Sequence, residues 1–89
     1  MHSIVTVIGK DRVGIIASIC ALLAGFDVNI LDLSQTVMEG FFTMTMLVDL
    51  STGDTPFDTL SAALSQKGEE MGLSIRIQRE DIFNAMHKI

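Results

Sequence analysis

The residues best suited to hold a small charged molecule follow the first apolar run of the chain. They are Asp11, Arg12, Val13 and Gly14, in a turn that leads directly into a helical pattern. The first turn of a helix presents unpaired backbone N–H groups and a partial positive charge, which suits a carboxylate. Asp11 can receive an ammonium group. The turn therefore has the chemistry to bind a zwitterion.

A second polar position, Asn29, stands fifteen residues after Gly14 and is followed by Ile30 at the start of a strand pattern. The amide of Asn29 can both donate and accept hydrogen bonds. Gly14 in a first helical turn costs about 0.5–1 kcal/mol relative to Ala, which favours close approach by a ligand or another chain. Simpler interpretations stay open, because Asp often caps a helix, Gly fits tight turns and Asn forms turns.

Other chemistry has little support in the sequence. His2 and His87 lie at opposite ends, without metal-ligand spacing, and no serine has a recognisable His and acid partner. Cys20 is the single cysteine, so no disulfide forms within the chain and a reducing, cytoplasmic compartment is expected. We expect no catalytic residue, no metal and no cofactor.

Composition and charge restrict the possible partners. The 89 residues, 48% of them hydrophobic, suit one domain spanning residues 1–89. A net charge of -5 repels polyanions, which argues against nucleic acid and anionic membranes. The longest uncharged run, Val13 to Phe26, is too short to span a bilayer. Six methionines leave more apolar surface than a lone domain usually hides, so a homodimer is expected.

The first half of the chain predicts a strand, a helix and a hairpin. Ser3 to Ile8 is β-branched and predicts a strand buried on both faces. A helix follows from Val13, with Asp11 or Arg12 as its cap. One side of this helix carries only small residues, which indicates either close packing by a partner or an undecorated surface: Gly14, Ala17, Ser18, Ala21, Ala24 and Gly25.

The hairpin joins Val28–Glu39 to Phe41–Leu50 through Glu39-Gly40. Its second strand places Phe42, Met44, Met46, Val48 and Leu50 on one apolar face, which we interpret as core or dimer surface.

The second half predicts a helix, a strand and a helical tail. Thr55-Pro56-Phe57-Asp58 is a helix-start pattern, and the helix ends near Gly72. Leu73 to Arg79 alternates like a strand with one wet face. From Glu80 a short helix is expected, with one apolar stripe made by Ile82, Phe83, Met86 and Ile89.

The order of elements predicts the fold class. A β-α-β-β-α-β chain with two right-handed crossovers makes an α+β, ferredoxin-like sandwich. We expect a four-stranded antiparallel sheet with two helices on one face, plus the short C-terminal helix. The opposite face is left for a partner.

The segment from Gly9 to Ile16, with Asn29-Ile30 after it, resembles the ACT domain. The family has an Asp-Arg-Pro-Gly-like turn, an apolar helix and a Gly-x-Asn-Ile-like start of the second strand; Val13 stands here in place of the usual Pro. Together with Asp32-Leu33-Ser34-Gln35-Thr36-Val37 and Ile82-Phe83, the chain is similar over its whole length to small bacterial and archaeal single-ACT proteins of unassigned role.

The resemblance implies a regulatory module that dimerises through sheets or helices and binds an amino acid at the interface near the first loop. Related modules occur in glycine-cleavage repressor-like proteins, amino-acid biosynthetic enzymes and formyltetrahydrofolate deformylase. Carried over residue by residue, it assigns the ligand loop to Asp11, Arg12, Val13 and Gly14, and the facing strand to Asn29 and Ile30.

We therefore expect a non-enzymatic dimer that binds an amino-acid effector and acts on an unidentified protein target. Two alternatives stay open. One is a dimeric adaptor that binds no small molecule. The other is an acylphosphatase-like hydrolase that uses Arg12 and Asn29, although Asp11 would oppose a phosphate.

Overall fold

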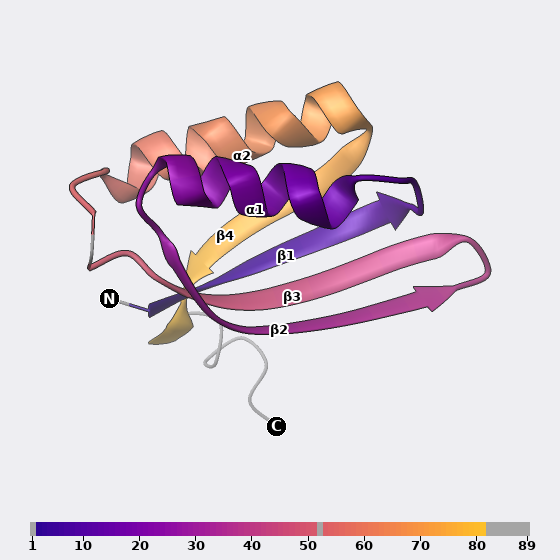
Figure 1. Cartoon of the computed structure of the whole chain (residues 1–89), viewed down its shortest axis with the longest axis horizontal. Helices are drawn as coiled ribbons and strands as arrows, with labels where there is room; N and C mark the ends of the chain where they lie inside the picture. The colour runs from indigo at the N-terminus through magenta and orange to yellow at the C-terminus, as the bar shows by residue number, and fades with distance from the viewer. Residues whose placement is uncertain (1, 52, 82–89) are drawn as a thin grey trace.

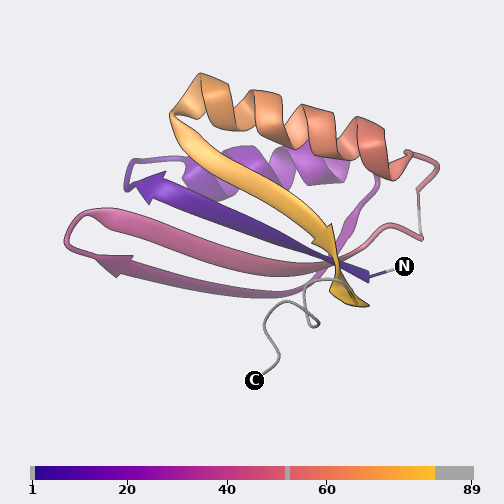
Figure 2. The ribbon, with the colours of Figure 1, turned by 180° about the vertical axis from the view of Figure 1, so that it is seen from behind.

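The computed structural model describes residues 2–51 and 53–81. It contains six elements in the predicted order: β1 (His2–Lys10), α1 (Ile15–Gly25), β2 (Asn29–Met38), β3 (Phe41–Asp49), α2 (Phe57–Met71) and β4 (Leu73–Arg79). The strands form one antiparallel sheet in the order β2-β3-β1-β4, and both helices cover the same face of it (Figures 1 and 2). The predicted ferredoxin-like α+β fold is confirmed. The predicted C-terminal helix lies mostly outside the described residues. Only its first two residues, Glu80 and Asp81, are described, and both are helical.

The core lies between the helices and one face of the sheet. Alternate residues of the two central strands are buried there, among them Val5 and Val7 of β1 and Met44 and Met46 of β3. This confirms the core interpretation of the methionine-rich strand. The prediction that the first strand is buried on both faces is wrong: among the described residues both helices lie on one side of the sheet, and on the other side Ile8 of β1 is 48% exposed.

Helix α1 begins at Ile15, two residues later than predicted. Gly14 takes the N-cap position with a φ of 89°, in the left-handed region, and no side chain caps the helix. Asp11 and Arg12 therefore do not cap it, contrary to the prediction. The left-handed backbone favours glycine for a conformational reason, so Gly14 is not a helix-interior residue that needs a ligand to explain it.

The hairpin between β2 and β3 turns through two residues with positive φ, Glu39 at 52° and Gly40 at 80°. This pattern matches the right-handed twist of paired strands and confirms the predicted turn. In the strand order β2 lies at one edge of the sheet, and its pairing with β3 has one irregularity in register between Ile30 and Asp32.

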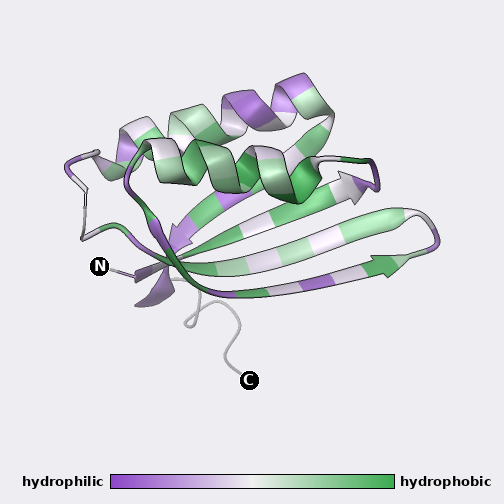
Figure 3. Ribbon diagram, in the orientation of Figure 1, coloured by the Kyte–Doolittle hydropathy of each residue, from purple (hydrophilic) through white to green (hydrophobic). Residues whose placement is uncertain are grey.

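Helix α2 begins at Phe57 after Pro56, and Thr55 makes no side-chain cap, so the predicted cap is one residue off. The helix ends as predicted at Gly72, whose φ is 71°. In the described residues no helix has the length and apolar character needed to cross a membrane. Figure 3 shows α1 coloured as hydrophobic along most of its length, whereas α2 becomes hydrophilic toward its C-terminal end.

Candidate functional site

A hollow of about 490 Å³ opens between the turn after β1 and the second half of β2. The turn and the first residues of α1 form one wall, and the last part of β2 forms the other. Because β1 and β2 run in the same direction with β3 between them, the C-terminal ends of both strands lie at the same end of the sheet (Figure 1). The lining residues are Asp11, Arg12, Gly14, Ile15, Ile16, Ala17, Gln35, Thr36, Val37 and Phe42.

Two hydrogen bonds hold the turn in place. The backbone N–H of Asp11 donates to the carbonyl oxygen of Gly40 at 2.8 Å, which joins the turn to the hairpin. The Arg12 guanidinium donates through Nη1 to the carbonyl oxygen of Met71 at 3.2 Å, at the C-terminal end of α2, where a cation is favourable. The turn is thus fixed from both sides although its residues are exposed.

The hollow offers three kinds of contact. The start of α1 has no side-chain cap and no acidic residue in its first turn, so its N–H groups remain available to an anion. The exposed carboxylate of Asp11 can pair with a cation. Ile16, Val37 and the buried ring of Phe42 supply apolar surface. Carboxylate, ammonium and an apolar side chain are the parts of a hydrophobic amino acid.

The structure brings only part of the predicted site together within one chain. Asp11, Arg12 and Gly14 line the hollow, whereas Val13 is 99% exposed at the tip of the turn and is not among the lining residues. Asn29 and Ile30 lie at the other end of β2, opposite Asp49 and Val48 of β3. Thr36 stands seven positions after Asn29 in the strand, which corresponds to roughly 23 Å.

Sequence reasoning missed the wall formed by Gln35, Thr36 and Val37. The fold class already contained the necessary signal, because a β-α-β crossover makes the first and second strands parallel. The residues that face the turn after β1 must then come from the end of β2, not from its start. The resemblance pointed instead to the start of β2.

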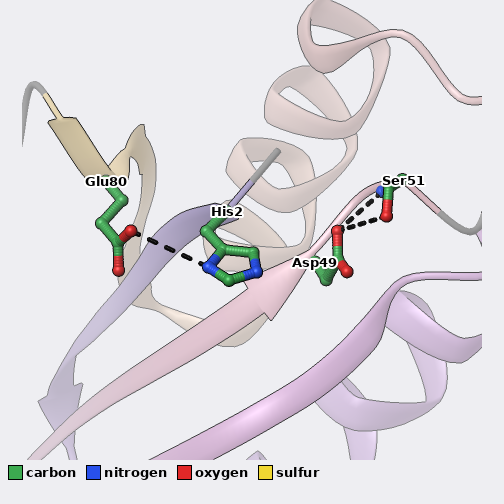
Figure 4. Close-up of polar contacts among 4 residues, drawn as sticks. All are labelled: His2, Asp49, Ser51 and Glu80. Atoms are coloured by element: carbon green, nitrogen blue, oxygen red, sulfur yellow. Dashed lines mark hydrogen bonds and ion pairs between the residues drawn. The ribbon is translucent and has the colours of Figure 1, made fainter.

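A second polar group lies at the opposite end of the sheet (Figure 4). His2 Nδ1 is 3.8 Å from Glu80 Oε1, and Asp49 accepts bonds from the backbone N–H and hydroxyl of Ser51 at 2.9 and 2.7 Å. These two bonds, first from the N–H and then from the hydroxyl, lower the pKa of Asp49 below its ordinary value. Across residues 2–51 and 53–81 no three His, Cys, Asp or Glu residues are grouped to hold a metal ion.

Comparison with known sequences identifies relatives along the whole chain. The sequence model of the ACT domain matches residues 2–78. A UPF0237 protein from Listeria monocytogenes is 52% identical over 89 residues, which is all of both chains.

Comparison with solved structures gives the same fold. An ACT domain protein from Streptococcus pneumoniae is 38% identical, with a TM-score of 0.82 over 98% of each chain. A formyltetrahydrofolate deformylase from Pseudomonas syringae is 28% identical, with a TM-score of 0.76; the match covers 88% of this chain and 27% of the deformylase. The fold thus occurs both as a small protein and as a minor part of a larger one.

Proposed function

The chain belongs to the ACT domain family, and on that premise we propose that it is a dimeric, non-catalytic regulatory module. In this proposal each dimer binds an amino acid in the hollow beside α1 and transmits its bound state to another protein. One observation carries the proposal: the two parts of the expected ligand site lie at opposite ends of the edge strand β2.

Pairing of two β2 strands would reunite those parts. A two-fold axis makes the strands antiparallel, so Asn29 of one subunit lies beside the end of β2 in the other. That end forms the wall of the hollow. The ligand would then contact Asp11 and the start of α1 from one subunit and Asn29 of the partner subunit. Each dimer would contain two such sites.

The β2 edge is suited to this pairing. Edge strands that avoid association usually carry charges or proline, but β2 contains a single charged residue, Asp32, and no proline. Most of its residues are exposed. Strand pairing along β2 would satisfy the free backbone groups of both subunits.

Exposed apolar residues gather at the end of the sheet where the hollow lies. Val13 is 99% exposed, Met38 69%, Phe41 55% and Val37 54%. They belong to the turn after β1 and to the adjoining hairpin, which a hydrogen bond joins. A monomer leaves these side chains in water, so association or a protein target at this end would remove apolar surface from solvent.

The small-residue side of α1 supports the same arrangement. Ala17, Ala21 and Ala24 are exposed at a spacing that places them along one side of the helix. Ala17 also lines the hollow, so this side is directed toward β2. When two β2 edges pair, the α1 helices of the subunits approach each other, and alanine side chains permit close contact.

Thermal unfolding in the presence of each amino acid tests effector binding. A ligand at a hundred times its Kd adds about 2.7 kcal/mol to the free energy of unfolding. For a domain of this size the midpoint would rise by roughly 10 °C or more. The hollow predicts that apolar amino acids raise Tm most. A dimer whose Tm no amino acid changes would favour the adaptor alternative.

Subunit complementation tests where the site lies. Asp11→Asn and Asn29→Ala each damage both sites of a homodimer. After mixing and subunit exchange, a heterodimer has one site with both changes and one site with neither. We expect about half of the dimers to regain one binding site, measured by calorimetric titration. No recovery after confirmed exchange would place all ligand contacts within one chain and contradict the shared site.

The hydrolase alternative finds less support in the geometry. Acyl phosphate chemistry would need Arg12 free and Asn29 close to it. Arg12 instead bonds to the end of α2, and Asn29 lies at the far end of β2. Acyl phosphate hydrolysis that disappears with Arg12→Ala would nevertheless overturn the non-catalytic proposal.

A further inference from the structure

We propose that Arg12 binds the carboxylate of the amino acid in the hollow and connects it to the C-terminal end of α2. The inference rests on the proposed function, since it concerns how the filled hollow acts on the rest of the fold. Arg12 lines the hollow, and its Nη1 donates to the carbonyl oxygen of Met71 at 3.2 Å. The two residues are 59 positions apart in the sequence, but the turn after β1 and the end of α2 lie at the same end of the molecule (Figures 1 and 2).

The C-terminal end of α2 lacks a cation of its own. A helix ends in carbonyl groups without intrahelical partners and in a partial negative charge, so a basic residue is favourable there. Residues 68–71, the last turn of α2, include Glu69 and Glu70 but no basic residue. Lys67, just before this turn, lies 3.8 Å from Glu70. The Arg12 guanidinium therefore supplies the positive charge that this helix end would otherwise lack.

The contact with Met71 leaves one edge of the Arg12 guanidinium open. A guanidinium has five N–H donors, and two parallel ones fit the two oxygens of a carboxylate. Within residues 2–51 and 53–81, Met71 is the one acceptor bonded to Arg12, and the bond uses Nη1. Nε and Nη2 form the other edge of the planar group, close to the start of α1 with its available N–H groups. The ligand and the helix end can therefore contact Arg12 at the same time.

Simultaneous contact couples the hollow to α2. A long exposed side chain loses rotamer freedom when a partner holds it. The Met71 carbonyl already restrains Arg12, so a carboxylate that enters the hollow meets a partly oriented guanidinium. By linkage, the bound carboxylate strengthens the contact with Met71 by the same factor. Because α2 continues through Gly72 into β4, the effect of the ligand reaches the edge of the sheet opposite β2, which pairing through β2 leaves free.

The same contact defines the chemical class of the ligand. Arg12 favours molecules with a free carboxylate, because an amide offers a single oxygen acceptor and no charge. L-leucine and L-leucinamide share the ammonium group and the apolar side chain and differ only at this position. We expect L-leucine to bind at least about ten-fold more tightly than L-leucinamide.

Matched glutamine substitutions in the full chain test the role of Arg12 in binding. Arg12→Gln and Lys10→Gln each remove one positive charge, but Lys10 belongs to β1 and is not among the lining residues. In calorimetric titration, Arg12→Gln should weaken L-leucine binding about ten-fold or more, and Lys10→Gln should leave it nearly unchanged. Arg12→Gln should also abolish the preference over L-leucinamide. Equal affinities of the two variants would refute the role of Arg12 and leave effector binding intact.

The Met71 carbonyl gives a readout of the connection to α2. Met71-Gly72 is the one Met-Gly pair in the sequence, so isotope labels in the methionine carbonyl and the glycine nitrogen isolate its NMR signal. We expect Arg12→Gln to shift the carbonyl signal in one direction. L-leucine added to the unchanged protein should shift it in the opposite direction, because the bond becomes stronger. A shift in the same direction would show that the ligand draws Arg12 away from α2, which contradicts the proposal.

Failure of the proposed function would give a different result. If L-leucine and the other amino acids change neither the Met71 carbonyl signal nor the amide signals of Asp11 and Gly14, nothing binds in the hollow and both proposals are wrong. If L-leucine shifts the amide signals of the turn but not the Met71 carbonyl signal, the hollow binds its ligand and only the connection to α2 is refuted.

Discussion

At the scale of single residues, Gly14 illustrates how backbone conformation and binding chemistry meet. Its φ of 89° reverses the chain between the turn and α1, so that the free N–H groups of the helix start lie beside the hollow. In the part of the chain that the structure describes, no atom beyond its two chain neighbours lies within 4 Å of the position that a Cβ would take. The constraint on this residue is therefore conformational rather than steric.

Gly14→Ala should lower the free energy of unfolding by about 1 kcal/mol, because a side chain disfavours the left-handed region. Gly25→Ala is the matched control. Gly25 also has open space around it, but its φ is not positive. Chemical denaturation of both variants measures the difference. Equal stabilities would show that the backbone at Gly14 is not held in this conformation.

Ser51 and Asp49 give a pH-dependent prediction. The pKa of Asp49 is below its ordinary value of 3.8 in the folded chain because Ser51 donates two hydrogen bonds to it. A carboxyl with a lowered folded pKa stabilises the fold above its unfolded pKa. This contribution is lost as the pH falls through the folded pKa.

Ser51→Ala removes the hydroxyl bond and keeps the backbone bond, so the pKa of Asp49 should rise toward 3.8. Carboxyl-carbon NMR titration measures this change. Asp49 is only partly buried, so the Tm effect should be small near neutral pH and should vanish once the carboxyl is protonated in both proteins. Ser65→Ala on the exposed side of α2 serves as the control. If Ser51→Ala still changes Tm in acid, the lost hydrogen bond to the Asp49 carboxylate is not the cause.

At the scale of elements, Gly68 determines how closely α2 packs on β4. A Cβ at this position would lie 2.6 Å from the carbonyl oxygen of Leu73 and 3.3 Å from a side-chain carbon of Ile75. Both neighbours belong to β4, and the nearer atom is backbone. A glycine inside a helix is usually unfavourable, but Gly68, in the last turn of α2, is required here for packing.

Gly68→Ala should destabilise the protein although alanine favours helix by about 1 kcal/mol. The steric conflict with Leu73 forces α2 away from the sheet, and overpacking of this kind costs typically about 1–3 kcal/mol. Comparing the Tm of Gly68→Ala with that of Gly25→Ala separates the packing effect from the helix propensity of alanine. A stabilising Gly68→Ala would show that α2 and β4 can move apart at little cost.

The sequence predicted the elements better than their ends. Alternation in Leu73–Arg79 and the apolar face of β3 depend on local pattern, and both predictions are confirmed. The start of α1 was wrong because Asp11 and Arg12 resemble caps, whereas they bond to the hairpin and to α2. Contacts between distant segments determined that outcome, and local pattern does not contain them.

At the scale of the whole molecule, the exposed edge of β2 gives the most direct prediction. Ser34 lies near the middle of this strand, and Ser74 lies on β4, the other edge of the same sheet. Both serines are exposed. Pairing through β2 would bring two copies of Ser34 close together near the two-fold axis, beside two copies of Asp32.

Ser34→Glu should weaken the dimer at least several-fold, because like charges facing each other across strands are destabilising. Ser74→Glu should leave the dimer intact. Sedimentation velocity over a dilution series measures both. A dimer weakened only by Ser74→Glu would assign the interface to β4, and a monomer in the unchanged protein would exclude the two-fold arrangement altogether.

The candidate site was only partly predictable, because the proposed site depends on which edge of the sheet pairs with a second subunit. The turn residues Asp11 and Gly14 follow from sequence, since they join two recognisable elements. Asn29 was assigned to the same site, yet it lies at the far end of β2 in the single chain. A site shared between subunits cannot be assembled from one sequence without knowing which edge pairs.

The hydrogen bond from the Asp11 N–H to the Gly40 carbonyl can be used to detect a change in the conformation of the turn after β1. It links two reversals of the chain that are otherwise 29 residues apart in sequence. Any rearrangement of the first reversal must either carry the second with it or break this bond. Solvent exchange of one amide proton, that of Asp11, therefore distinguishes a rigid receptor from one that changes shape when it is filled.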